Sequence, residues 1–264
     1  MELIDSHCHF DFDDFALDRS EVWQRCCQLG LKGMVIPGVS IAQWRTLFEL
    51  LQRRPEWHGA VGVHPWWVKE LATDHPGPGE ELQEWLLGQL LHWGRNSRCV
   101  AIGECGLDRA IDTPLALQRD IFRVHLRAAC ELQLPLIIHV HRYHADVLAL
   151  LKEYRPLRGG VIHAFSGSEE IAREYWKLGF YLGIGGTITY PRAAKTRRAV
   201  AAVPLEALLL ESDAPDMPLS GRQGQRNSPE FLPDIAAELA SLRAVPVEEV
   251  AVQALRNTRQ LFSL

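Results

Sequence analysis

Histidine and carboxylate side chains follow several short apolar segments of this sequence, at the points where buried strands would end. The first segment runs into His7-Cys8-His9, and residues two apart in an extended chain point to the same side, so both imidazoles can reach one ion. Four later segments end in a comparable residue: Glu104, His139, His163 and Asp213. This set of ligands suits Zn, Mn, Co or Mg. The pattern therefore predicts a metal site.

The predicted ligand set is larger than one tetrahedral ion requires, which favours two divalent ions, with Mg, Mn and Zn as the open choices. Glu104 comes from a strand between the others and is the natural bridging carboxylate. Two ions about 3.5–4 Å apart activate a water and stabilise the leaving oxygen of a phosphodiester. Asp213 has two compatible roles, as a metal ligand and as the general base for that water. Glu104 and Asp213 are therefore the predicted catalytic residues.

Strand-like segments alternate with longer helical segments along the whole chain. Strands are expected at Glu2–Asp5, Gly33–Pro37, Gly59–Val63, Val100–Glu104, Leu136–His139, Gly160–His163, Tyr181–Ile184 and Ala207–Glu211. Helices are expected at Arg19–Leu29, Ala42–Arg53, Glu80–Trp93, Leu115–Leu132, Ala145–Glu153, Glu169–Leu178, Ala193–Val203, Pro229–Leu242 and Val247–Leu261. Most of the strand segments are near-continuous apolar runs, which is typical of parallel strands buried on both faces. These units predict an α/β fold, a (β/α)8 TIM barrel formed by residues 1–264 as one domain, with an extra C-terminal helix.

Such a barrel builds its active site at the carboxyl ends of its strands, where the predicted ligands lie. An open, doubly wound sheet is the alternative fold. It usually has a glycine-rich turn after its first strand, whereas Asp5–His9 contains no glycine. Two long loops rich in proline and glycine are expected at residues 72–79 and 214–228. The second loop follows the last strand and should overhang the mouth of the barrel.

Charge and cysteine content argue against several classes of protein. The net charge of −5 disfavours a protein that clamps long nucleic acid by charge alone, but it is compatible with a local phosphate site. The six cysteines include no C-x-x-C pair, and Cys26 adjoins Cys27, so no disulfide framework is expected. The N-terminus lacks the features of a signal peptide, and no segment reaches about 18 apolar residues, which predicts a cytoplasmic protein without a membrane span.

Seven segments resemble the TatD family of metal-dependent deoxyribonucleases and follow the family's order along nearly the whole chain. They are Ile4–His9, Gly62–Pro65, Ile102–Asp108, Ile138-His139, Val161–Gly167, Gly185-Gly186 and Leu210–Pro215. The resemblance implies a TIM barrel of the amidohydrolase type with two divalent cations. One cation would lie among His7, His9, Glu104 and Asp213, and the other among Glu104, His139 and His163. The segments Gly185–Pro191 and Asp213–Pro218 are more similar to a YjjV-like bacterial subgroup.

The resemblance also implies an activity, the hydrolysis of DNA phosphodiester bonds, and some members resemble 3′-end exonucleases. The implied substrates are DNA ends or short oligonucleotides, and the oligomeric state stays open. Two departures from the family pattern lie outside the ligand set. Arg109-Ala110 follows Gly-Leu-Asp, where members often have an aromatic residue, and Val140-His141-Arg142 follows the fifth-strand histidine. Both departures concern contacts with the substrate.

Three residues near the expected mouth are candidates for substrate binding. His64, in Gly-Val-His-Pro after the third strand, can contact a phosphate or donate to the leaving oxygen, or it can pack the loop. Arg222 and Arg226 lie in the loop after the eighth strand, where barrels often bind phosphate, and surface solubility is the alternative. The adjacent pair Trp66-Trp67 can stack on a base or pack against the loop.

Other polar residues have two interpretations each. Glu211, two residues before Asp213, either holds a ligand imidazole in its tautomer or forms a structural ion pair. His141 and His144 either line the mouth or start the following helix. The remaining histidines are expected at the surface or in packing: His58, His75, His92 and His125.

Three functions are compatible with these residues. The favoured one is a metal-dependent deoxyribonuclease that acts on DNA ends in a 3′–5′ exonuclease-like manner. The alternative is an amide or ester hydrolase of the amidohydrolase type, such as a deacylase. Many such barrels bridge their metals with a modified lysine at the fourth strand, whereas Glu104 stands there and no lysine lies between Lys69 and Lys152. The third is a non-catalytic metal-binding protein, which convergent ligands at an open mouth disfavour.

Overall fold

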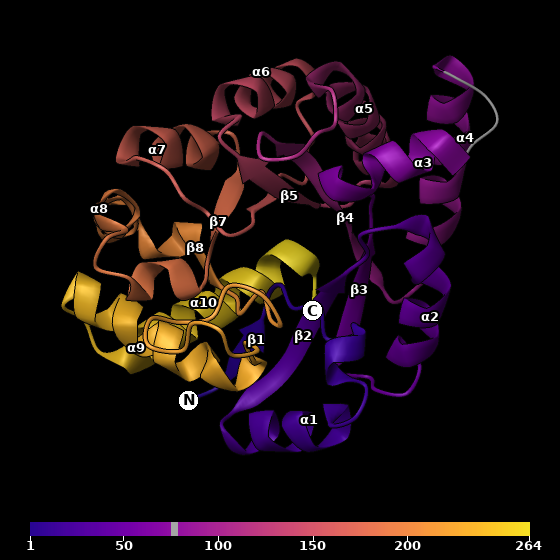
Figure 1. Ribbon diagram of the computed structural model, residues 1–264. Coiled ribbons are helices and arrows are strands. Elements are labelled where there is room, and N and C mark those ends of the chain that lie inside the picture. Colours follow the sequence, from indigo (N-terminus) through magenta and orange to yellow (C-terminus); the bar gives the residue numbers. More distant parts are fainter. Residues whose placement is uncertain (75–78) are drawn as a thin grey trace.

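The computed structural model describes residues 1–74 and 79–264, and its central feature is a barrel of parallel strands (Figure 1). The eight strands pair in chain order, and every pairing is parallel. They are β1 Leu3–Asp5, β2 Leu31–Pro37, β3 Trp57–Val61, β4 Cys99–Asp108, β5 Leu136–His141, β6 Gly160–Ile162, β7 Phe180–Ile184 and β8 Leu208–Leu210. At the closing edge, Ser6 N–H donates to Leu210 O at 3.0 Å and Asp213 N–H donates to His7 O at 2.9 Å. The TIM-barrel prediction is confirmed.

Helices follow the strands and cover the outside of the barrel (Figure 1). They are α1 Arg19–Gln28, α2 Ile41–Leu51, α3 Val68–Asp74, α4 Glu80–Gly94, α5 Leu115–Leu132, α6 His144–Tyr154, α7 Glu169–Lys177, α8 Ala194–Ala202, α9 Leu232–Arg243 and α10 Val247–Phe262. Short 3-10 turns are η1 Asp13–Phe15, η2 Pro65–Trp67, η3 Gly186–Thr189, η4 Leu205–Ala207 and η5 Pro229–Phe231. The helix α10 is the predicted extra C-terminal helix.

The predicted loop at residues 72–79 is partly helical. Its first three residues belong to α3, a helix that is not among the predicted elements. Residues 75–78 lie outside the described residues, and so does the predicted surface or packing position of His75. The other predicted loop, at residues 214–228, contains no helix or strand and lies after β8 as expected.

An apolar layer inside the barrel supports the residues above it. The layer consists of Val35, Ala60, Ala101, Ile137, Val161, Tyr181 and Leu209, and Leu261 and Phe262 from the end of the chain pack against it. Residues two apart on a strand share a face, so His139 lies one step beyond Ile137, and His163 one step beyond Val161. The apolar layer therefore lies directly beneath the imidazoles and supports them at the carboxyl ends of the strands.

Strand β4 is irregular at the point where Glu104 lies. The register of β4 against β5 shifts between Ile102 and Cys105. Gly103 has a φ of +145°, and a Cβ atom at this position would lie 2.4 Å from the carbonyl oxygen of Ile137. Only glycine accepts both this conformation and this close approach. The glycine therefore allows the irregularity that aims the Glu104 side chain into the barrel.

None of the described helices combines the length and the apolar character needed to cross a membrane. All six cysteines have free thiols, and Cys8, Cys26, Cys99 and Cys105 are buried. The Cys99 thiol donates to Ala101 O at 3.3 Å, so this buried cysteine takes part in the packing of the core.

Candidate metal centre

Two imidazoles from the end of β1 and two carboxylates define one half of the site. His7 Nε2 and His9 Nε2 lie 3.3 Å apart. Glu104 Oε2 lies 3.2 Å from His7 Nε2 and 3.5 Å from His9 Nε2. Asp213 Oδ1 lies 3.5 Å and 3.6 Å from the same two nitrogens. Cys8, between the two histidines, donates to Ala214 O at 3.5 Å and stands outside this set of donor atoms.

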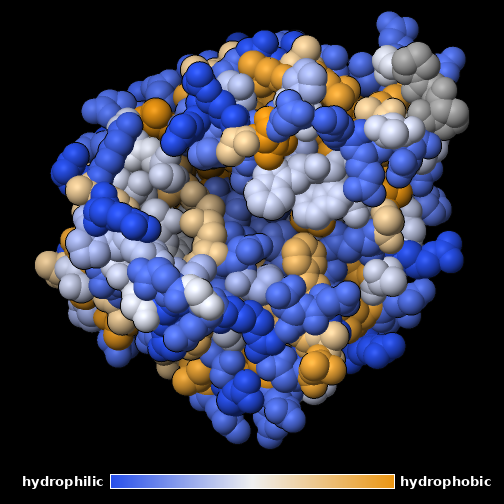
Figure 2. Space-filling view, in the orientation of Figure 1, coloured by the Kyte–Doolittle hydropathy of each residue, from blue (hydrophilic) through white to orange (hydrophobic). Residues whose placement is uncertain are grey.

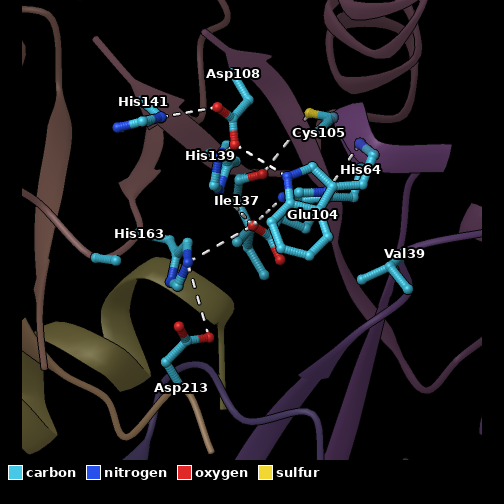
Figure 3. A network of polar contacts seen from close by, with 12 residues as sticks. Val39, His64, Glu104, Cys105, Asp108, Ile137, His139, His141, His163 and Asp213 are labelled. Carbon is cyan, nitrogen blue, oxygen red and sulfur yellow. Dashed lines mark hydrogen bonds and ion pairs between the residues drawn. The ribbon is translucent and has the colours of Figure 1, made fainter. Parts of the chain in front are cut away.

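The other carboxylate oxygen of Glu104 faces a second set of imidazoles (Figure 3). Glu104 Oε1 lies 3.2 Å from His139 Nδ1, 3.4 Å from His64 Nε2 and 3.6 Å from His163 Nε2. The ring of His163 also stacks on His7, with centroids 3.7 Å apart. Glu104 therefore stands between two sets of donors, one on each of its oxygens.

The spacing of the first set of donor atoms matches the requirement of a metal ion. In a tetrahedral site with bonds of about 2.0–2.2 Å, the ligand atoms lie roughly 3.3–3.6 Å apart. The distances given above for the first set run from 3.2 to 3.6 Å. The groups His7–His9–Glu104 and His64–Glu104–His139 are each compact enough to hold an ion. Imidazole and carboxylate ligands fit a divalent cation, so the residues present can bind metal.

Burial sets the protonation of most of these groups in favour of metal binding. It lowers the pKa of His9 to about 4 and the pKa of His64 to about 3, so both rings are neutral at pH 7. Burial alone would raise the pKa of Glu104, but the surrounding imidazoles, His163 first, outweigh it and hold this pKa well below its usual range. Neutral imidazoles and ionised carboxylates are the forms that bind metals.

Asp213 and His163 are clear exceptions, and His139 is a third. Burial lowers the pKa of the His139 imidazole, but Asp108 and Glu104 outweigh this effect and raise it. Burial raises the pKa of the Asp213 carboxyl to about 8. Burial lowers the pKa of His163, but Asp213 and Glu104 outweigh this effect and raise the pKa of the imidazole to about 10. Both groups therefore hold protons at neutral pH, and a metal ion that uses them as ligands must displace those protons.

Asp108, at the end of β4, anchors His139 from behind (Figure 3). Its Oδ2 lies 3.0 Å from His139 Nε2 and accepts the Trp66 indole N–H at 3.0 Å, and its Oδ1 lies 2.8 Å from His141 Nδ1. A carboxylate on the far nitrogen fixes the tautomer and the orientation of a metal-binding imidazole. Asp108 is not among the predicted site residues. The sequence held one signal for this role. Asp108 lies four residues after Glu104 in the same segment, and side chains an even number of residues apart on a strand share a face.

Glu211 anchors His163 in the same way. Its Oε1 lies 3.1 Å from His163 Nδ1 and accepts the backbone N–H of Ala164 at 2.5 Å. Gly183 on β7 makes room for this carboxylate, since a Cβ atom there would lie 2.1 Å from Glu211 Oε2. Of the two interpretations from the sequence, this geometry agrees with the one in which Glu211 holds a ligand imidazole.

Buried polar residues fix the loop that presents Asp213, whose backbone is left-handed with a φ of +57°. Asp5 accepts the backbone N–H of Ser212 at 2.9 Å and that of His7 at 3.2 Å, which ties the ends of β8 and β1 together. Asn227 donates from its amide to Ser212 O at 2.8 Å. Neither Asp5 nor Asn227 is among the predicted site residues, because their partners are backbone groups that the sequence does not reveal.

The metal-binding groups lie in an open cavity of about 320 Å³ at the carboxyl ends of the strands. Apolar residues form part of its wall: Phe12, Val39, Trp66, Trp67 and Met217. Figure 2 shows the hollow near the centre of this face, bordered by both hydrophilic and apolar side chains. Trp66 is 61% exposed at the edge of the cavity, so its ring is accessible to a bound molecule.

The structure does not bring the two predicted phosphate-binding arginines to this cavity. Arg226 forms an ion pair with Asp18 through both guanidinium amino groups, at 2.9 Å and 2.6 Å. Arg222 lies 3.8 Å from the centroid of the Phe231 ring and 3.7 Å from Asp234. The loop after β8 folds back so that these cations face carboxylates near α1 and on α9, and neither is among the residues that line the cavity.

The remaining histidines have separate surroundings. His64 lines the cavity, and His141 is half-buried beside Asp108 at its rim. His144 lies 3.1 Å from the Tyr175 hydroxyl and 3.0 Å from Ser166 O at the start of α6. His125 is buried, accepts the backbone N–H of Val63 at 2.9 Å, and so packs the segment before His64 as a structural residue.

Sequence comparison places these features within a known family. A profile of the family described as TatD related DNase matches residues 4–263. The chain is 39% identical over 263 residues to the uncharacterized metal-dependent hydrolase YjjV of Escherichia coli (strain K12), covering 99% of this chain and 98% of YjjV. It is 32% identical over 259 residues to the 3′-5′ ssDNA/RNA exonuclease TatD of Erwinia tasmaniensis, covering 95% of each chain.

Structural comparison agrees with the sequence match. The crystal structure of YjjV from Escherichia coli K12 matches with a TM-score of 0.91 and covers 99% of this chain and 98% of its own. An organophosphorus hydrolase from Deinococcus radiodurans, 16% identical, matches with a TM-score of 0.69 over 98% of this chain and 92% of its own, and shares the fold alone. The chain therefore belongs to the TatD family and is a metal-dependent hydrolase.

Proposed function

We propose that the protein is a metal-dependent deoxyribonuclease that removes nucleotides from the 3′ ends of single-stranded or frayed DNA. The central observation is that Glu104 turns one oxygen toward His7 and His9 and the other toward a second set of imidazoles. This arrangement suits a pair of divalent cations that share one carboxylate. The name of the Erwinia tasmaniensis relative, a 3′-5′ ssDNA/RNA exonuclease, supports a nucleic-acid substrate.

The residues divide into two ligand sets in this proposal. The first set consists of His7, His9, Glu104 and Asp213, and the second of Glu104, His139 and His163. A pair of divalent cations, when bound, lowers the pKa of water and stabilises the charge that develops on a phosphodiester. Imidazole ligands favour Zn or Mn, and carboxylates also admit Mg.

Asp213 is the proposed proton acceptor. Its Oδ1 lies among the imidazoles, 3.6 Å from His9 Nε2, inside the cavity. Burial raises the pKa of this carboxyl to about 8, close to the pH at which it would work. A general base transfers protons most efficiently when its pKa lies near the working pH. Asp213 can take the proton of the attacking water once bound metal has displaced the proton of its own carboxyl.

His64 is the proposed donor to a phosphate oxygen. Its Nδ1 accepts the backbone N–H of Trp66 at 3.2 Å, and burial keeps the ring neutral at pH 7 by lowering its pKa to about 3. The single proton of the neutral ring is then on Nε2, which faces the cavity beside Glu104. This tautomer makes His64 a hydrogen-bond donor to the substrate, in agreement with the role expected from its sequence.

Trp66 is the proposed platform for the terminal base. Asp108 holds its indole N–H at 3.0 Å, so the exposed ring has a fixed position at the edge of the cavity. Stacking of a base on an aromatic ring contributes about 1–3 kcal/mol without sequence preference. A strand end fits this arrangement better than an intact duplex, whose bases are paired and stacked on each other.

The test uses protein that is stripped of metal with a chelator and reloaded with Mn or Mg. It should shorten 5′-labelled single-stranded DNA from the 3′ end and give a regular ladder of products. Asp213→Asn should lower kcat by at least about 100-fold, because it removes a ligand and the proton acceptor together. Asp234→Asn, which alters an exposed carboxylate on α9, is the matched control and should retain the rate.

Two outcomes would contradict the proposal. Equal rates for wild type and Asp213→Asn would assign the nuclease activity to another site or to a contaminant. Turnover of amide or ester substrates without any turnover of DNA would favour the deacylase alternative. Circular dichroism of each variant separates a loss of chemistry from a loss of fold.

A further inference from the structure

Several cations at the mouth of the barrel have no carboxylate partner. They are Arg109, Arg142, Arg192 and Lys195, and together they are named the basic arc. Each is exposed, and within the described ranges 1–74 and 79–264 no carboxylate oxygen lies within 4.0 Å of their charged nitrogens. Arginines elsewhere on the surface do form such pairs, for example Arg25, Arg119, Arg127 and Arg173. The basic arc therefore keeps unpaired positive charge at this rim, as do a few exposed arginines elsewhere in the described ranges, such as Arg45 and Arg256.

All members of the basic arc follow the carboxyl end of a strand. Arg109 follows β4, Arg142 follows β5, and Arg192 and Lys195 follow β7. Parallel strands end on one face of a barrel, so these side chains surround the same mouth as the metal centre. The backbone N–H of Arg109 donates to His141 O at 3.2 Å, which places the first two cations on neighbouring loops. Figure 2 shows strongly hydrophilic side chains beside the hollow in the region of α7 and α8.

A second cavity lies beside the metal pocket and is lined by one member of the basic arc, Arg192. It has a volume of about 250 Å³ and is lined in part by Tyr190, Arg192 and Met217. Met217 also lies on the wall of the metal pocket, so the two cavities adjoin. The guanidinium of Arg192 lies 4.8 Å from the centroid of the Tyr190 ring, and the Tyr190 hydroxyl donates to Pro218 O at 2.6 Å. Arg192 is therefore held at a cavity that adjoins the metal pocket at Met217.

Lys195 occupies an unfavourable place for a cation. It lies in the first turn of α8, which has neither an acidic residue in that turn nor a side-chain N-cap. The N-terminus of a helix has the positive end of the helix dipole and unpaired N–H groups, so it favours an anion. A hydrogen bond with Ser168 and, to a smaller extent, the charge of Lys195 lower the pKa of Glu170. A bound phosphate would satisfy both the lysine and the helix end.

We propose that the basic arc binds the backbone phosphates of a single-stranded nucleic acid whose 3′ end lies in the metal pocket. The inference rests on the proposed function and adds the path of the strand. Beside the loop after β8 the mouth has Asp14 and Asp216, whose charges interact with each other and repel a polyanion. The strand therefore leaves the pocket toward α6, α7 and α8, away from η1, where Asp14 lies. A protein of net charge −5 attracts a polyanion only through such a local cluster.

The test compares substrates of two lengths with the Mn-loaded full-length protein. In the double variant Arg192→Glu/Lys195→Glu, KM for a single-stranded oligonucleotide of about twelve residues should rise at least about tenfold at low salt. The slope of log KM against log salt should fall in magnitude by about 0.7 for each lost phosphate contact. A dinucleotide, which reaches little beyond the metal pocket, should show a much smaller rise in KM.

The matched control is Arg256→Glu, the same change of charge at an exposed arginine on α10. The neighbouring Asn257 donates to the carbonyls of Leu205 and Leu208, which lie where β8 begins, so this arginine is at the end of the barrel opposite the mouth. Arg109→Glu/Arg142→Glu tests the other half of the basic arc in the same way. Melting curves of all variants exclude loss of fold as the cause of a change.

The outcomes separate this inference from the proposed function. If the wild type cleaves the oligonucleotide and the arc variants keep the KM and salt slope of Arg256→Glu, the basic arc is not a binding surface, although the nuclease proposal stands. If the wild type neither binds nor cleaves the oligonucleotide, the proposed function and this inference are both overturned. A large rise in KM for the long substrate with a reduced salt slope supports the basic arc.

Discussion

The floor of the mouth, where the metal centre lies, and its rim, where the basic arc lies, differ in how their charged groups are paired. On the floor, Glu104 faces imidazoles on both of its oxygens, and Asp108 and Glu211 hold two of those rings from behind. On the rim, the basic arc has no carboxylate partner in the described part of the chain, whereas Arg226 in the loop after β8 is paired with Asp18. Matched charges fix a geometry, and unmatched charges are available to a ligand. In our proposals, the floor carries out the chemistry and the rim binds the substrate.

The largest effect is expected from Glu104→Gln, which removes the charge that both donor sets share. We expect loss of bound metal and a fall in kcat/KM of more than about 1000-fold. Mutation of a residue that only hydrogen-bonds to a metal ligand already lowers metal affinity or activity by about 10–100-fold, and Glu104 is a ligand itself. The metal content of the purified variant and its rate on single-stranded DNA are the measurements. A Glu104→Gln variant that keeps its metal and a near wild-type rate would contradict the role of the floor in metal binding and chemistry.

A smaller effect is expected from Asp108→Asn, which keeps the size of the side chain but removes its charge. His139 then loses the carboxylate that fixes its tautomer, so metal affinity at the second donor set should fall about 10–100-fold. Calorimetric titration with Mn measures this affinity. Asp112→Asn is the control, because this fully exposed carboxylate forms an ion pair with the surface residue Lys69. Equal affinities in the two variants would show that Asp108 is no part of the metal site.

Metal affinity should also depend on pH between about 6 and 8. Burial raises the pKa of Asp213 to about 8, so below that pH the carboxyl is protonated and a proton competes with the metal. Affinity should therefore rise with pH, about tenfold per pH unit for each displaced proton. Titration calorimetry in buffers of different ionisation heats counts the released protons. A metal affinity that does not change across this pH range, without proton release, would show that Asp213 holds no proton that the metal must displace.

The smallest effect is expected from Arg226→Ala. The half-exposed ion pair with Asp18 should contribute about 1 kcal/mol or less to the free energy of unfolding. KM for the oligonucleotide should stay close to the wild-type value, because this guanidinium faces Asp18 and is not among the residues that line the cavity. Denaturant unfolding and steady-state kinetics test both parts. A marked rise in KM would return Arg226 to the substrate-binding surface and weaken the contrast between the two sides of the rim.

The barrel was predictable because its strands leave a clear signal. Parallel strands covered on both faces are short apolar runs, and all eight were located within a few residues. The largest error is at β4, predicted to end at Glu104 but continuing to Asp108, because Cys105-Gly106-Leu107-Asp108 resembles a loop in composition. The helix α3 was missed because its seven residues run directly into a segment rich in proline and glycine.

From the sequence, site residues could be predicted only where they lie at the end of a strand. His139 and His163 end apolar runs, and a closed barrel brings such ends together. The role of Asp108 depends instead on how its carboxylate reaches the His139 ring of the neighbouring strand. The pairing of Arg226 with Asp18 joins residues 208 positions apart, and no local pattern reveals it. Long-range pairing decides which surface cations are free, so the basic arc required the structure.

The most direct test of the metal centre is anomalous scattering from crystals loaded with Mn. We predict two peaks, one on each side of the Glu104 carboxylate, with His7, His9 and Asp213 beside the first and His139 and His163 beside the second. Crystals of well-folded protein with no peak near Glu104, and with these imidazoles turned away from one another, would contradict the metal centre on which the proposed chemistry depends.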